Sequence, residues 1–185
     1  MIEDIYNDTK DKMNKSIEAL KTELAKIRTG RASLSMFDGI KADYYGAATP
    51  INQIASIAVP ESRLVTIQPW DAAAIKEIEK AILKSDLGLT PSNDGKIIRL
   101  AIPPLTEQRR KEIVKTVNKV CENYKVAIRN IRRDANDLLK KLKKEGEIAE
   151  DQAFKSQDDV QKITDDYIKK IDAVYKEKEA EVLEI

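Results

Sequence analysis

Apolar residues recur at steps of three and four along three segments of the chain, and a different pattern lies between the first two. In the first segment, residues 2–28, charged residues fill the remaining positions. Its apolar stripe consists of Ile2, Tyr6, Thr9, Met13, Ile17, Leu20, Leu24 and Ile27. This spacing predicts one long amphipathic helix that buries a single face.

Two further segments near the C-terminus repeat this pattern. Thr106 is a good N-cap for the second helix, and Gly146 ends it. Its apolar stripe consists of Ile113, Val117, Val120, Tyr124, Ile128, Ile131, Ala135, Leu138 and Leu142. The third helix is expected from Asp151, with the stripe Val160, Ile163, Tyr167, Ile171, Val174 and Val182. Three helices of similar pattern predict one three-helix bundle.

Residues 30–105 predict a small α+β unit. Short strand-like runs at 40–45, 51–59, 64–68 and 97–102 are separated by glycine and proline. Asp71 can cap one helix that reaches about Lys84. We expect Trp70 to pack under this helix. Strand alternation should bury one of Tyr44 and Tyr45 and expose the other.

The order of these segments indicates an insertion. The fold class is α+β with two domains: a three-helix bundle (1–29 and 106–185) and an inserted β/α/β domain (30–105). The chain passes between them at 29–31 and 102–105. Gly30 permits unusual dihedrals, whereas Pro103 and Pro104 fix φ, so these short connections predict either a hinge or a fixed boundary.

Charge is segregated along the chain although the formal net charge is only +1. Residues 106–145 carry 13 basic and 6 acidic side chains, whereas residues 146–185 carry 6 and 12. At about 100° per residue, one face of the second helix, away from its apolar stripe, is cationic. This face, the basic stripe, comprises Lys111, Lys115, Lys125, Arg129, Arg132, Arg133, Lys140, Lys143 and Lys144, joined by Asn136.

The basic stripe favours a nucleic-acid partner. Guanidinium groups bind phosphate bidentately and stack on bases, and a phosphate backbone requires positive charge along one face. One alternative is a solvated face, partly paired with the acidic last helix. Another is a coiled-coil adaptor that binds a protein through its helices, with little dependence on salt.

The sequence contains no pattern typical of an enzyme's catalytic site. The chain has no histidine and a single cysteine, Cys121, which is expected to pack rather than react. Neither a metal-binding motif nor a phosphate-binding glycine loop is present, so no cofactor is expected. No run of roughly 18 apolar residues and no signal peptide is seen, which favours a cytoplasmic protein.

Several motifs resemble the bacterial ribosome recycling factor family. They are Lys26–Ser33 (KIRTGRAS), Asp43–Gly46 (DYYG), Ser85–Leu89 (SDLGL), Ile102–Glu107 (IPPLTE) and Val126–Asp137 (VAIRNIRRDAND). They match in order and spacing along nearly the whole chain. One departure is Leu34, where the family commonly has proline, and this change is expected to loosen the entry to the small domain.

The resemblance implies an L-shaped, monomeric translation factor with a flexible hinge. It further implies that, after termination, the protein and elongation factor G with GTP split the 70S ribosome into subunits and release it from mRNA. Its bundle would bind large-subunit ribosomal RNA, and the protein would not hydrolyse GTP itself.

The resemblance also assigns roles to individual residues. Arg129, Arg132 and Arg133 match the RNA-contacting cluster of the family, and Arg110 matches a further contact. Arg28 is a candidate RNA contact, and Lys125 of the basic stripe joins the set. The residues that match the hinge are Gly30, Arg31, Pro103 and Pro104.

Overall fold

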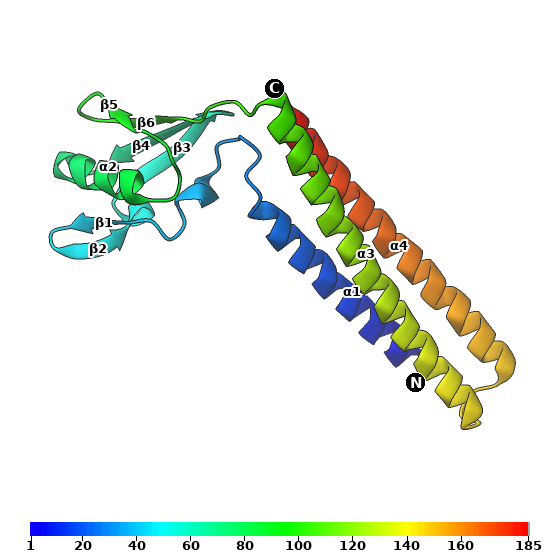
Figure 1. The fold of residues 1–185 in the computed structure, drawn as a ribbon. Coiled ribbons are helices and arrows are strands. Elements are labelled where there is room, and N and C mark those ends of the chain that lie inside the picture. The colour runs from blue at the N-terminus through cyan, green and yellow to red at the C-terminus, as the bar shows by residue number, and fades with distance from the viewer. Residues whose placement is uncertain (185) are drawn as a thin grey trace. The chain divides into compact units, whose positions relative to one another are not determined.

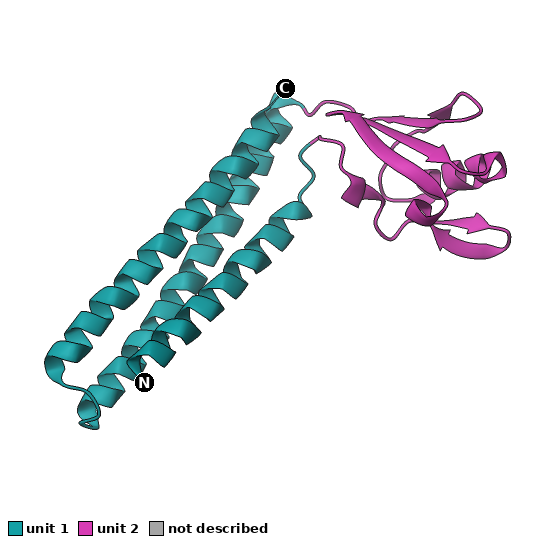
Figure 2. Cartoon of the chain, turned by 180° about the vertical axis from the view of Figure 1, so that it is seen from behind, with its two compact units in different colours: residues 1–29, 106–185 teal, residues 30–105 magenta. Residues whose placement is uncertain are grey.

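The computed structural model describes residues 1–184, which fold into two compact units (Figure 2). Unit 1 combines Met1–Thr29 with the chain from Thr106 onward, and unit 2 is Gly30–Leu105. Unit 1 is helical, whereas unit 2 combines strands with one α-helix. The predicted α+β class is confirmed.

Unit 1 consists of three long helices that lie side by side (Figure 1). They are α1 (Ile2–Ala25), α3 (Glu107–Lys144) and α4 (Glu150–Leu183). Each contributes fully buried side chains to the core, among them Met13 and Leu20, Ile128 and Leu139, and Val160 and Ile171. Burial of these faces stabilises the bundle by roughly 1.5–3 kcal/mol for each large apolar side chain.

Capping residues set the ends of these helices. The Thr106 hydroxyl accepts a hydrogen bond from the Arg109 amide at 3.1 Å, as expected of an N-cap. Gly146 follows α3 with φ +76°, a left-handed conformation that costs glycine little. Helix α1 ends at Ala25, three residues earlier than predicted, because the Ile27 amide bonds to the Leu24 carbonyl in a tighter turn.

The apolar stripe of α3 differs at two places from the sequence prediction. Leu138 is 46% exposed, whereas Leu139 is fully buried. Likewise Cys121 is buried, while Val120 is only half-buried. At both places the buried side chain belongs to the residue after the predicted one. The reason is that α3 packs between α1 and α4 rather than against a single helix.

Unit 2 contains two antiparallel sheets. A hairpin is formed by β1 (Lys41–Tyr44) and β2 (Ala47–Pro50). A second sheet has the order β3–β4–β6–β5 and consists of β3 (Ala55–Glu61), β4 (Leu64–Pro69), β5 (Ser92–Asn93) and β6 (Ile98–Ala101). Three short helices precede or join these elements: η1 (Leu34–Phe37) comes before β1, η2 (Ile51–Gln53) lies between β2 and β3, and η3 (Ala72–Ala74) leads into α2 (Ile75–Lys84).

Helix α2 and the four-stranded sheet enclose the core of unit 2. The inward positions of β4 and β6 alternate, so Val65, Ile67, Ile98 and Leu100 are all fully buried. The predicted packing of Trp70 under α2 is wrong, because its side chain is 70% exposed. The alternation of β4 predicts this exposure. Trp70 lies three positions after the buried Ile67, which places it on the opposite face of the strand pattern.

Candidate nucleic-acid interface

The basic stripe runs along α3, and its central arginines lack carboxylate partners. Arg129 and Arg133 are exposed, and Arg132 is half-buried. Within residues 1–184, none of the three forms an ion pair. Three guanidinium groups within five residues therefore keep their full charge available to a ligand. Such groups suit the planar, bidentate recognition of phosphate.

Arg132 and Arg133 are held by neutral amide groups. Nη1 of Arg132 donates to Oε1 of Gln161 on α4 at 3.2 Å. Nη1 of Arg133 donates to Oδ1 of Asn130, one turn earlier on α3, at 3.4 Å. These bonds restrict the side chains without cancelling their charge.

Lys125 differs from the arginines because two carboxylates hold its ammonium group. Nζ lies 2.7 Å from Asp172 of α4 and 3.2 Å from Glu122, and the side chain is only 17% exposed. The hydrogen bond to Asp172 is the main cause that raises the pKa of Lys125. Lys125 therefore contributes to α3–α4 packing, and a phosphate would compete with Asp172 and Glu122 for its ammonium group.

Ion pairs are formed by some lysines nearer the ends of the stripe. Lys111 pairs with Glu107 at 3.0 Å, and Lys143 pairs with Glu150 at 3.0 Å. Both pairs are exposed and therefore contribute little to stability. They lower the net charge at the ends, which concentrates positive charge at the middle of the stripe.

Arg110 and Arg28 lie on other parts of unit 1. Arg110 stands in the first turn of α3, half-buried, and its Nε is buried without a hydrogen-bond partner among the described residues. A buried donor without an acceptor is costly to the fold. Arg28 is exposed beyond the end of α1.

The residues predicted to form the hinge lie between well-defined anchor points. In unit 1, Thr29 is buried, and its hydroxyl donates to Glu181 at 3.1 Å. In unit 2, the amides of Ala32 and Ile102 donate to the carbonyls of Ser62 and Arg63, at 2.7 and 2.8 Å.

The four predicted hinge residues fall between these anchors: Gly30, Arg31, Pro103 and Pro104. Gly30 has φ +76°, and both prolines are exposed. The stretches that lie between the anchored residues are thus 30–31 in the first connection and 103–105 in the second.

The rest of the described chain contains neither a metal-binding cluster nor an exposed thiol. No cluster of three acidic or cysteine side chains in residues 1–184 could hold a metal ion. Cys121 is buried, and desolvation raises the pKa of its thiol. Residues 1–184 likewise contain no helix long and apolar enough to cross a membrane.

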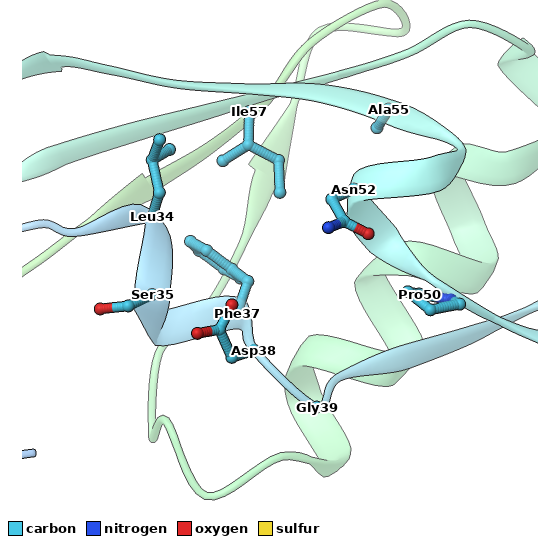
Figure 3. A pocket seen from close by; sticks show the side chains of 9 residues that line it. All are labelled: Leu34, Ser35, Phe37, Asp38, Gly39, Pro50, Asn52, Ala55 and Ile57. Atoms are coloured by element: carbon cyan, nitrogen blue, oxygen red, sulfur yellow. The ribbon is translucent and has the colours of Figure 1, made fainter.

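A shallow pocket lies in unit 2 beside η1 (Figure 3). Leu34, Phe37 and Ile57 supply apolar lining, and Asp38 and Asn52 supply polar side chains. None of the predicted RNA-binding or hinge residues lines it.

The β1–β2 hairpin presents an exposed tyrosine. Tyr45 is 79% exposed with φ +51°, and its hydroxyl donates to Asp71 at 2.6 Å. Tyr44 is half-buried and packs against the core, with its ring edge-on to that of Tyr45. The expected division between one packed and one exposed tyrosine is confirmed.

Comparison with known proteins identifies relatives over the full chain. Residues 20–183 match the family model of the ribosome recycling factor. The ribosome-recycling factor of Desulfatibacillum aliphaticivorans is 66% identical over 184 residues, covering 100% of both chains. That of Desulforapulum autotrophicum is 61% identical over 185 residues, again covering 100% of both.

Solved structures of similar fold are also ribosome recycling factors. A solution structure of a ribosome recycling factor matches with a TM-score of 0.74 and 39% identity, covering 100% of this chain and 98% of the other. A second match has a TM-score of 0.65 and 48% identity, with 99% of each chain covered. It comprises models of the T. thermophilus ribosome recycling factor and the E. coli elongation factor G bound to the E. coli post-termination complex.

Proposed function

This chain belongs to the ribosome recycling factor family, and on that premise we propose that it recycles ribosomes after translation termination. It binds the post-termination ribosome and, with elongation factor G and GTP, promotes dissociation into subunits and release from mRNA. The similar structure with elongation factor G on a post-termination complex supports this proposal. The protein acts in the cytoplasm as a monomeric binding factor and contributes no catalytic group.

The observation that carries the RNA-binding part is the unneutralised arginine cluster on α3. Arg129, Arg132 and Arg133 lie within about one helical turn, and each retains guanidinium N–H groups free of carboxylates. Unit 1 binds large-subunit ribosomal RNA through this cluster. Because surface ion pairs add little stability, concentrating arginines here is explained better by a ligand than by the fold.

Three further cations extend the RNA-binding surface. Arg110 lies half-buried in the first turn of α3. Arg28 lies beyond the end of α1. Lys125 contributes less than the arginines, because a phosphate there competes with its existing ion pairs to Asp172 and Glu122.

The connections at 29–31 and 102–105 act as the hinge between anchored RNA-binding helices and the unit on which elongation factor G acts. Support comes from the hydrogen bonds of Thr29, Ala32 and Ile102, which fix the ends of these connections and leave residues 30–31 and 103–105 between them. Motion of unit 2 while unit 1 stays bound would disrupt contacts between the ribosomal subunits.

Co-sedimentation with purified bacterial 70S ribosomes at low and moderate salt tests the RNA anchor. The wild-type protein is compared with Arg132→Glu and, as a charge-matched control, Lys155→Glu on the exposed start of α4. We expect binding to fall steeply with salt, because phosphate contacts release counterions, and to be lost in Arg132→Glu alone. Equal loss in both variants, or none in Arg132→Glu, would show that the cluster is not the anchor.

A protein-binding adaptor is the second candidate, and the exposed aromatic side chains of Tyr45 and Trp70 on unit 2 favour it. An adaptor predicts no sedimentation with ribosomes at any salt concentration. Subunit splitting, followed by light scattering with elongation factor G and GTP, separates the two functions directly.

A further inference from the structure

Three cations on the α4 side of α3 reach across to α4, and they meet two kinds of partner. Lys125 lies 2.7 Å from the carboxylate of Asp172, and Lys143 lies 3.0 Å from that of Glu150. Arg132 instead meets the side-chain amide of Gln161, with Nη1 and Oε1 3.2 Å apart. The middle cation is thus bonded to a neutral acceptor, whereas both of its neighbours are bonded to anions.

The orientation of this amide is fixed from its other end. Nε2 of Gln161 donates to Oδ1 of Asp165, one turn later on α4, at 2.9 Å. Because a carboxylate only accepts hydrogen bonds, the NH₂ group must face Asp165 and the oxygen must face Arg132. Asp165 therefore forms no ion pair with Arg132, and the side-chain amide of Gln161 lies between them.

We propose that Gln161 is a positioning residue for Arg132, holding its guanidinium ready for ribosomal RNA without neutralising its charge. This inference rests on the proposed function. A long arginine side chain loses rotamer freedom when it binds a ligand, and a bond formed beforehand reduces that cost. Arg132 uses one Nη1 hydrogen for Gln161, so Nε–H, both Nη2 hydrogens and the second Nη1 hydrogen are left for phosphate.

The choice of amide over carboxylate makes the proposal testable. In Gln161→Glu, a carboxylate would hold Arg132 in the same place but pair with its charge. We expect the thermal unfolding midpoint to change little, because the new ion pair offsets repulsion from Asp165. Ribosome binding should nevertheless weaken, since phosphate must then compete with the introduced carboxylate. If Gln161 had a purely structural role, ribosome binding in Gln161→Glu would weaken only as far as the fold is destabilised, so a variant with an unchanged unfolding midpoint would bind like the wild type.

The experiment measures affinity for 70S ribosomes across a salt series for Gln161→Ala, Gln161→Glu, Arg132→Ala and the double variant Arg132→Ala/Gln161→Ala. Loss of one orienting hydrogen bond should weaken binding by roughly 3- to 10-fold in Gln161→Ala. In the Arg132→Ala background the same substitution should change affinity by less than about 2-fold, because nothing remains to be positioned. Asn7→Asp, an exposed amide-to-carboxylate change on α1, is the control for added negative charge.

The outcomes separate this inference from the proposed function. If Arg132→Ala weakens binding but both Gln161 variants bind as the wild type does, positioning by Gln161 is wrong and the RNA anchor stands. Equal effects of Gln161→Ala with and without Arg132 would also overturn it. If Arg132→Ala binds normally, the anchor itself is wrong, and the positioning role falls with it.

Discussion

Gly30 and Leu105, the first and last residues of unit 2, lie so close that a Cβ atom on Gly30 would come within 2.8 Å of Cγ of Leu105. Gly30 also has φ +76°, which other L-residues rarely adopt. The two connections therefore meet at a position that only glycine fills without strain.

Substituting Gly30 should impair both folding and recycling. Gly30→Ala costs about 1–2 kcal/mol for the left-handed conformation and roughly 1 kcal/mol or more for displacing Leu105. Gly39→Ala is the matched control, because Gly39 has φ +80° but nothing within 4 Å of the added Cβ. Denaturant unfolding and subunit splitting measure the two effects. If both variants were equally destabilised, contact with Leu105 would carry no cost.

Asp172 should restrain Lys125 from binding ribosomal RNA. Asp172→Asn removes the closer carboxylate partner, and we expect tighter 70S binding and a salt slope steeper by about one unit, since one more phosphate contact forms. Asp166→Asn removes the same charge from an exposed position on α4 and serves as the control. Equal gains in both variants would indicate a general charge effect rather than release of Lys125.

The exposed position of Trp70 can be measured directly, because it is the sole tryptophan of the chain. We expect red-shifted emission that acrylamide quenches efficiently. Trp70→Ala should change the free energy of unfolding by less than about 0.5 kcal/mol, whereas truncation of fully buried Ile78 to alanine should cost about 2–5 kcal/mol. Blue-shifted, protected emission would contradict this exposure.

Leu34 begins η1, where proline should be tolerated and even favoured. Ser33 before it is extended, with φ −146° and ψ 144°, and a residue that precedes proline prefers this region. Leu34→Pro should therefore stabilise the protein by about 0.4–1 kcal/mol by restricting the unfolded chain. Leu34→Ala controls for loss of the exposed side chain. Destabilisation specific to the proline variant would show that the Leu34 amide is needed.

Asp94 should make stability depend on pH in the acid range. Its carboxylate accepts hydrogen bonds from the amides of Ile97 and Lys96 and from Arg99, which lower its pKa from 3.8 to about 2. Because the folded pKa lies below the unfolded value, this contribution is fully present above about pH 4 and is lost as the pH falls towards 2.

The test compares Asp94→Asn with the wild type. The difference in unfolding free energy should be constant at neutral pH and shrink below about pH 4. A difference that persists unchanged at about pH 2 would exclude the carboxylate as its source.

Local patterns were enough to predict much of this protein. Helical periodicity, the Thr106 cap and Gly146 specify three helices, because each depends only on residues three or four positions apart. The strand-like runs between residues 30 and 105 interrupt the helical pattern, and this local change indicated that a second domain is inserted there. The concentration of arginines at 129–133 is likewise visible in the sequence.

Other features depended on contacts between distant segments, which periodicity does not encode. Whether Leu138 or Leu139 is buried depends on how α3 packs between two helices, and the exposure of Trp70 depends on which side chains already fill the core of unit 2.

The same limit applies to the cations of the basic stripe. Lys125 meets Asp172 and Arg132 meets Gln161 because the antiparallel register of α3 and α4 brings residues 29 or more apart in sequence side by side. The sequence determined where the positive charge lies, and only the tertiary structure decided which cations are neutralised, because partner choice follows from that register.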